Sequence, residues 1–325
     1  MQPVQATASV DQFRRDVLKG LRSTPKRIPC KYFYDAWGSK LFEQICYLPE
    51  YYLTRAELEI MEGSAGEMSA WMGPQIRLIE FGSGNSVKTR ILLDSLDRLS
   101  VYIPVDISRR HLGSVSSRLA ADYPGIEVVP LAADYSAALT LPVASVPFRR
   151  TIAYFPGSTV GNMNDAKAVS FLKKVGDLVG EEGALLMGMD LVKDPGILEA
   201  AYDDRAGVTA KFNLNLLERM RRQLGAQVVS ANFSHFVRYN SSLERIEMYF
   251  RSNCQQTIIV GDHVFSVEKD ELIHTENCHK YTPEKALDLA ARGGFSVRKM
   301  WYDSNQYFSV QYWESKTREI FTAGC

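Results

Sequence analysis

The sequence predicts a doubly wound α/β fold, because short apolar runs alternate with helical patterns between Gln75 and Val192. Such apolar runs, each bounded by turn residues, are typical of buried parallel strands joined by helical crossovers. The chain has 325 residues, of which 46% are hydrophobic, so it can bury a large core. We therefore expect an open, mostly parallel sheet with helices on both of its faces.

The elements of this expected sheet follow one another in a regular order. Helical periodicity comes first, in residues 11–21, 40–47 and 54–61, and residues 31–57 form an aromatic-rich stretch. The strands are expected at 76–81, 101–107, 126–135, 149–157 and 183–192, and the helices between them after Gly82, at 108–124 and at 165–180. Five strands in a βαβ rhythm make the doubly wound interpretation specific.

The rhythm changes after Val192. Helical patterns are followed by short runs that alternate apolar and polar residues, as antiparallel strands do, up to about residue 281. A helix at 283–294 and apolar runs at 295–303 and 307–315 then end the chain. We expect residues 193–281 to form an inserted α+β domain, while residues 1–192 and 282–325 together form the discontinuous core.

Charge and cysteine content restrict the partners and the compartment. The 38 basic residues balance 38 acidic ones, so no overall field draws the chain to nucleic acid or to a membrane surface. The five cysteines are odd in number and form no CxxC pair, which disfavours a disulfide framework. No secretory signal and no run of eighteen apolar residues is present. These features predict a cytoplasmic protein with neither a nucleic-acid nor a membrane partner, and we expect a monomer that acts on a small molecule.

A glycine turn, Gly82-Ser83-Gly84, follows the first strand of the expected sheet. Glycines there permit a tight turn and a close approach of a ligand to the backbone. A dinucleotide fingerprint needs a third glycine where Val87 stands, and the sequence contains no phosphate loop. Glu80, beside the turn, suits a ligand with a cationic amino-acid group, as in S-adenosylmethionine. The turn therefore favours a methyltransferase over a nicotinamide-dependent dehydrogenase.

Acidic residues end the next two strands. Asp106 can hold the ribose hydroxyls of a nucleoside, and Asp134 can accept a hydrogen bond from the adenine amino group, with Tyr135 beside the ring. His274 and His279 fit no zinc signature, because strand alternation places residues 274, 276 and 278 on one face and 279 on the other. We expect no metal site.

Several blocks of the sequence carry a resemblance to a known family. The blocks are KYFYDAWGSKLFEQICYLPEYYLTRAE, LIEFGSGNSVKTRILLDSL, FPGSTVGN, GMDLVKD, AYDDRAGVTAKFNLN and TENCHKY. In this order, from about Pro25 to the C-terminus, the chain resembles the histidine-specific Nα-methyltransferases of ergothioneine biosynthesis. The resemblance implies a class I, Rossmann-like S-adenosylmethionine methyltransferase core with an inserted substrate-binding domain. It also implies that the α-amino group of histidine receives three methyl groups, which gives hercynine.

The resemblance also implies roles for individual residues. Tyr34 lies near the methyl donor and the substrate amine, and Tyr51 lines the substrate pocket. Asn162 and Tyr202 bind the substrate carboxylate, and Glu276 binds the imidazole ring. The implied cofactor-binding residues are Tyr34, Gly82, Ser83, Gly84, Lys88, Asp106, Asp134 and Tyr135.

One position departs from the family pattern. Cys278 stands where the histidine enzymes can place a serine hydroxyl on the imidazole ring, and a thiol is the weaker donor and acceptor. The same family includes enzymes that methylate prenylated tryptophan, so tryptophan, its prenylated form or another aromatic amino acid is the alternative substrate. A non-catalytic S-adenosylmethionine-binding protein is the alternative of a different class.

Overall fold

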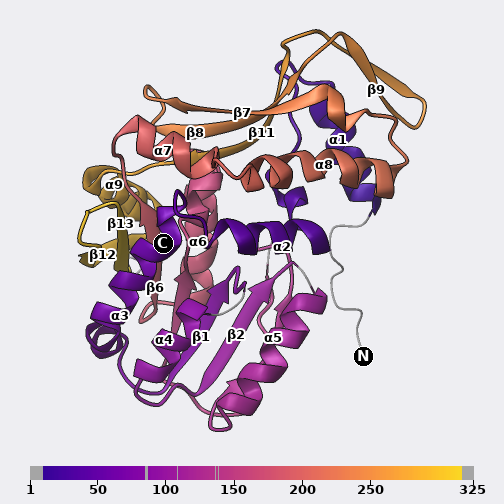
Figure 1. The fold of residues 1–325 in the computed structure, drawn as a ribbon. Helices are drawn as coiled ribbons and strands as arrows, with labels where there is room; N and C mark the ends of the chain where they lie inside the picture. The colour runs from indigo at the N-terminus through magenta and orange to yellow at the C-terminus, as the bar shows by residue number, and fades with distance from the viewer. Residues whose placement is uncertain (1–9, 85–86, 108, 136, 138, 317–325) are drawn as a thin grey trace, which may run out of the picture. The chain divides into compact units, whose positions relative to one another are not determined.

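The computed structural model describes residues 10–84, 87–107, 109–135, 137 and 139–316 (Figure 1). Within these residues the chain forms two compact units. The first unit contains Ala56–Leu191 and the segment that starts at Tyr281, and the second contains the N-terminal segment up to Arg55 together with Val192–Lys280. The sequence predicts residues 1–192 to belong to the core, whereas the structure groups the N-terminal helices with the inserted segment.

The first unit is built on an eight-stranded sheet in the order β12-β13-β6-β5-β1-β2-β3, with β4 also paired to β2. Strands β1 (Ile76–Phe81), β2 (Val101–Asp106), β5 (Arg150–Phe155) and β6 (Ala184–Asp190) run parallel. Strands β12 (Phe295–Tyr302) and β13 (Phe308–Ser315) extend this sheet as an antiparallel hairpin beside β6. The doubly wound α/β prediction is confirmed, including the return of the last segment to the first sheet.

The third expected strand differs from the prediction. Residues 126–135 form two short strands, β3 (Glu127–Val128) and β4 (Leu131–Ala132), instead of one continuous strand. Pro130 lies between them, and a proline has no N–H to donate to a neighbouring strand. Both short strands still pair with β2, so the chain after β4 reaches the same edge of the sheet.

Among the described residues, five helices of this unit lie along the sheet. They are α3 (Tyr52–Met72), α4 (Val87–Ser95), α5 (Arg109–Asp122), α6 (Asp165–Val179) and α9 (Pro283–Gly293). The Asn164 side chain accepts a hydrogen bond from the N–H of Lys167 at the start of α6. Helix α3 continues eleven residues past the expected end at Met61, because Ala65, Met68 and Met72 continue its buried face although Gly63 and Gly66 weaken the local signal.

The second unit combines helices with two small antiparallel sheets. Its helices are α1 (Val10–Leu21), α2 (Ala36–Ile45), α7 (Pro195–Tyr202) and α8 (Val208–Leu224). One sheet has the order β11-β8-β7, from β11 (Leu272–His279), β8 (Arg245–Ser252) and β7 (Phe233–Asn240), and the other is the hairpin of β9 (Gln256–Val260) and β10 (His263–Val267). The antiparallel character expected after Val192 is confirmed.

The N-terminal segment belongs to this unit because it packs on α8. The rings of Phe33 and Phe212 lie 4.8 Å apart between centroids. The Arg219 guanidinium donates to the carbonyl oxygen of Tyr32 over 2.7 Å, and the Asn215 amide donates to Asp35 over 2.9 Å. Apolar and polar contacts therefore join two segments that are far apart in the sequence.

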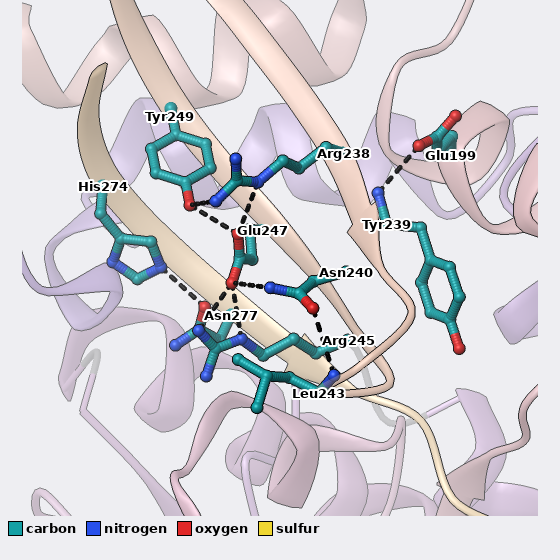
Figure 2. A network of polar contacts seen from close by, with 10 residues as sticks. All are labelled: Glu199, Arg238, Tyr239, Asn240, Leu243, Arg245, Glu247, Tyr249, His274 and Asn277. Atoms are coloured by element: carbon teal, nitrogen blue, oxygen red, sulfur yellow. Dashed lines mark hydrogen bonds and ion pairs between the residues drawn. The ribbon is translucent and has the colours of Figure 1, made fainter. Parts of the chain in front are cut away.

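Strand β11 contains an irregularity that changes which side chains share a face. Its pairing with β8 shifts between His274 and Glu276, and the His274 ring contacts Asn277 at 2.8 Å, three residues away. Regular alternation would place His274 on the same face as Glu276, so that prediction is wrong. The extra residue of the bulge puts His274 and Asn277 on one face, as Figure 2 shows, and it leaves Glu276 and Cys278 for the other.

No helix in the described part of the chain has the length and apolar character needed to cross a membrane.

Candidate functional site

The glycine turn lies directly after β1 and requires glycine at two positions. Gly82 and Gly84 have φ values of +74° and +48°, which other residues rarely adopt. The N–H of Gly82 donates to the carbonyl oxygen of Val105 over 2.8 Å, which fixes the turn beside the end of β2. Ser83 is buried. The predicted glycine turn is therefore present, and it is held in place at the carboxyl edge of the sheet.

The structure brings Asp106 and Asp134 to this same edge. Asp106 is the last residue of β2, and its partner in β4 is Ala132. The N–H of Ala133 donates to the Asp106 carbonyl oxygen over 3.0 Å, so Asp134 follows immediately. Both side chains are partly exposed. Two carboxylates beside a glycine turn at the carboxyl ends of parallel strands match the place where α/β sheets bind nucleosides.

Tyr135 lies in a cluster of phenylalanine rings. Its ring centroid is 6.0 Å from that of Phe81, 5.5 Å from that of Phe155 and 5.9 Å from that of Phe171. Such edge-to-face contacts hold the ring against the core. The tyrosine therefore forms an apolar wall next to Asp134.

Glu80 does not lie where the sequence argument expects it. Its side chain is 2% exposed and accepts hydrogen bonds from the Thr89 hydroxyl, at 2.8 Å from each carboxylate oxygen, and from the Tyr102 hydroxyl. Burial raises the pKa of Glu80 to about 7, although the hydrogen bonds from Tyr102 and Thr89 oppose this. Through these buried hydrogen bonds, Glu80 connects β1 to α4 and to β2. Its carboxylate thus supports the turn instead of facing a ligand.

Lys88, a predicted cofactor residue, pairs with a carboxylate that sequence reasoning missed. Its ammonium forms an ion pair with Glu57 of α3, whose side chain is fully buried. The N–H of Gly157 donates to both oxygens of Glu57 at 3.0 Å. A Cβ at Gly188 would lie 2.5 Å from Glu57 Oε1, so any other residue there would displace the carboxylate. The sequence does contain a signal for Glu57, because this glutamate lies on the apolar face of a helix, between Leu53 and Ile60.

Asn162 belongs to the loop that this carboxylate helps to hold. It ends a short 3₁₀ helix, Thr159–Asn162, that follows β5, and its side chain is partly exposed. The preceding Ser158 adopts a left-handed conformation with φ 57°, and its hydroxyl accepts from the N–H of Asp190 over 2.9 Å. The loop after β5 is therefore fixed by Glu57 on one side and by β6 on the other.

In the second unit, three predicted substrate residues form a buried cluster with a lysine. The Tyr202 hydroxyl donates to the Cys278 sulfur over 2.8 Å, and the Lys280 ammonium donates to both, at 3.0 Å to Tyr202 Oη and 3.2 Å to Cys278 Sγ. Glu276 is 7% exposed, and burial raises its pKa to about 7 against the opposing charge of Lys280. The structure thus places Tyr202, Glu276 and Cys278 together.

The other face of the same sheet holds a polar network that fixes the strands (Figure 2). Glu247 of β8 accepts from Arg238 over 2.7 Å, from Arg245 over 2.6 Å and from the Tyr249 hydroxyl over 2.6 Å. Although burial acts in the opposite direction, these hydrogen bonds lower the pKa of Glu247 to about 2. Glu247 pairs with Asn277 across β8 and β11, and Met248 pairs with Glu276. The network therefore sets the register that places Glu276.

Tyr34 and Tyr51 belong to an aromatic cluster with two phenylalanines. The Tyr34 ring centroid is 5.5 Å from that of Phe42 and 5.6 Å from that of Phe212. The Tyr51 ring lies 6.3 Å from Phe42 and 6.1 Å from Tyr202. Burial raises the pKa of Tyr51 well above its usual value, so its hydroxyl stays neutral. Phe42 and Phe212 were missed, since an aromatic residue is more often part of a core than of a site.

The comparison with known proteins decides the family. Residues 13–315 match the family described as "Histidine-specific methyltransferase, SAM-dependent". The chain belongs to this family. It is 39% identical to the histidine N-alpha-methyltransferase of Mycolicibacterium smegmatis, over 92% of this chain and 93% of that protein. The recognition made from the sequence blocks is confirmed, and with it S-adenosylmethionine as the cofactor of the family.

More distant relatives show the range of this methyltransferase family. Ergothioneine biosynthesis protein 1 of Neurospora crassa is 29% identical over 87% of this chain, but the match covers only 32% of that longer protein. An N-methyltransferase of Aspergillus fumigatus is 24% identical over 90% of this chain and 81% of its own length. The first two relatives carry the name of a histidine or ergothioneine enzyme, and the third has a name that specifies only N-methylation.

Proposed function

We propose that the chain transfers methyl groups from S-adenosylmethionine to the α-amino group of L-histidine, three in succession, and forms hercynine. The observation that carries this proposal is the buried carboxylate of Glu276, grouped with Tyr202 and Cys278 in a chain of the histidine-specific family. A buried carboxylate that accepts from an imidazole N–H favours a ligand that offers such a donor over one that lacks it.

The residues of the first unit fit the cofactor. The turn at Gly82 and Gly84 allows close approach to the backbone, and the partly exposed Asp106 and Asp134 offer acceptors to a nucleoside. When bound, the cofactor supplies a methyl group on a positively charged sulfur. We propose that Asp106 binds the ribose hydroxyls, Asp134 the adenine amino group, and Lys88 the carboxylate end of the cofactor.

The aromatic cluster of the second unit suits an amine whose charge changes as it is methylated. The nucleophile must be a neutral amine, and a low-dielectric environment disfavours the protonated form. We propose that Tyr34 accepts a hydrogen bond from the amine and directs its lone pair. After the third methylation the nitrogen carries a permanent charge and no N–H, and the faces of Tyr34, Phe42 and Phe212 can then stabilise it by cation–π attraction.

The two ends of the amino acid need fixed contacts while the nitrogen is methylated repeatedly. We propose that Tyr202 and Asn162 bind the carboxylate, that Glu276 and Cys278 bind the ring, and that Tyr51 lines the pocket between them. Orientation of this kind supplies most of the acceleration in a displacement that needs little covalent work from the protein. A cytoplasmic location and a monomeric state also stay predictions.

A mass-spectrometric assay tests the proposal. The purified chain is incubated with S-adenosylmethionine and each amino acid in turn, and we expect a product with three added methyl groups from histidine alone. Tyr34→Phe should slow every transfer, and Glu276→Gln should raise the KM for histidine while the affinity for the cofactor is unchanged. Glu268→Gln, an exposed position in the turn that precedes β11, is the matched control. Preferred methylation of tryptophan or a tryptophan derivative would contradict the assignment of histidine.

A further inference from the structure

Lys280 is the most unusual charged residue of the second unit. Its side chain is among the largest that are fully buried, and the residue is only 2% exposed. A lysine is almost never buried so completely unless other groups compensate its charge. It directly follows β11, two residues after Cys278 and four after Glu276. None of the roles assigned above uses it.

The contacts of Lys280 point to the substrate residues. Its ammonium donates to Tyr202 Oη at 3.0 Å and to Cys278 Sγ at 3.2 Å, and it lies 4.6 Å from the centre of the Tyr202 ring. The Tyr202 hydroxyl also donates to the sulfur at 2.8 Å. The Tyr202 oxygen, the Cys278 sulfur and the Lys280 nitrogen therefore all contact one another. The ammonium can only donate hydrogen bonds, because it has three N–H groups and no acceptor.

Lys280 also supplies the positive charge beside Glu276. The titratable groups near Glu276 include Cys278 on its own strand, Lys280 directly after that strand, Tyr51, and Tyr202 of α7, which contacts both Cys278 and Lys280. Of these only Lys280 is a cation. Its charge favours the ionised form of Glu276, whereas burial favours the protonated form. Removal of the lysine would therefore remove a charge that opposes the effect of burial.

We propose that Lys280 is a positioning residue of the substrate site: its buried ammonium fixes the Tyr202 hydroxyl and the Cys278 thiol, and it keeps Glu276 able to accept a hydrogen bond from the substrate ring. This inference rests on the proposed function for its substrate. Its effect on Glu276, however, exists in the protein alone, so the two proposals can fail separately.

The test compares Lys280→Met, which removes the charge, with Lys280→Arg, which keeps it, and with the exposed Lys269→Met as the control. Infrared difference spectra of the substrate-free protein between pH 5 and 9 follow the protonated carboxyl band, which Glu276→Gln identifies. We expect the Glu276 titration to move upward by at least one pH unit in Lys280→Met. It should stay within half a unit of the wild type in Lys280→Arg and Lys269→Met.

The kinetic measurement follows from the same argument. At pH 6, below both titrations, we expect Lys280→Met to raise the KM for histidine by about tenfold, which corresponds to one pH unit of displaced titration, and to leave the affinity for S-adenosylmethionine unchanged. The increase of the KM should become smaller as the pH rises. Should Lys280→Met not fold, Lys280→Gln replaces it in both measurements, because the amide also lacks the charge and can still donate to Tyr202.

The outcomes separate the two proposals. An unmoved Glu276 titration in the uncharged variant would overturn the role of Lys280, as would a loss of kcat at an unchanged KM and pH profile. A wild-type chain that methylates another amino acid would overturn the choice of histidine, while a displaced Glu276 titration would still support the positioning role.

Discussion

Replacement of Glu57 by glutamine should destabilise the protein and weaken its cofactor binding together. Glu57 is fully buried, and the side chain of its partner Lys88 is 22% exposed. Removal of one member of a buried ion pair costs about 3–5 kcal/mol, and we expect the lower end, about 3 kcal/mol, because Lys88 keeps some contact with water. Glutamine can still accept from the N–H of Gly157. In Glu57→Ala this donor would lose its acceptor, at a further cost of about 1–3 kcal/mol.

The assay is urea-induced unfolding of Glu57→Gln, Lys88→Met and the double variant, with calorimetric titration of S-adenosylmethionine on each. The double-mutant cycle should give a coupling energy of about 2 kcal/mol, because the two side chains touch. Glu62→Gln, an exposed position on the same helix, should change the free energy of unfolding by less than about 0.5 kcal/mol. A coupling energy below about 0.5 kcal/mol, or an unchanged cofactor affinity in Glu57→Gln, would refute the idea that Glu57 positions Lys88.

Three further predictions concern other residues. Burial raises the pKa of Glu80 from 4.5 to about 7, so its contribution to stability is greatest below pH 4.5 and decreases as the pH rises toward 7. The unfolding free energy of Glu80→Gln should therefore improve relative to wild type by about 2–3 kcal/mol between pH 5 and 8, and a difference that is independent of pH would contradict this. Asp204 accepts from the N–H groups of Val208 and Thr209 at 2.9 and 2.7 Å at the start of α8, so Asp204→Ala should cost about 1–2 kcal/mol in urea unfolding, and an unchanged midpoint would argue against a capping role. Cys278→Ser should lower the KM for histidine or leave it unchanged, because a hydroxyl is a stronger hydrogen-bonding group than a thiol; a large rise measured in steady-state kinetics would show that the thiol is preferred.

The local pattern of the sequence was sufficient for most of the first unit. Apolar runs separated by helices predicted the parallel strands, because strands buried on both faces need continuous apolar residues. The exception is informative. Pro130 interrupts the strand expected at 126–135, and a close reading of that one residue would have predicted the break. Gly82, Asp106 and Asp134 were predicted as cofactor residues for the same reason, since the carboxyl ends of adjacent parallel strands must meet at one edge.

The predictions that failed required knowledge of what lies next to a side chain in space. Glu80 was expected to face a ligand, but Thr89 and Tyr102 surround its carboxylate. His274 was expected beside Glu276, but a bulge in β11 separates them, and no local rule marks an extra residue in a strand of ordinary composition.

The order of the elements, the parallel sheet, the glycine turn and, through the motif blocks, the family follow from the amino-acid sequence. Each of these depends on residues that are close in the chain or on a fixed spacing. The tertiary structure alone decided that the N-terminal helices pack on α8, that Glu57 pairs with Lys88, and that Lys280 lies buried against Tyr202 and Cys278. Such pairs form because burial makes an uncompensated charge costly, and which distant residues compensate it depends on how the elements pack.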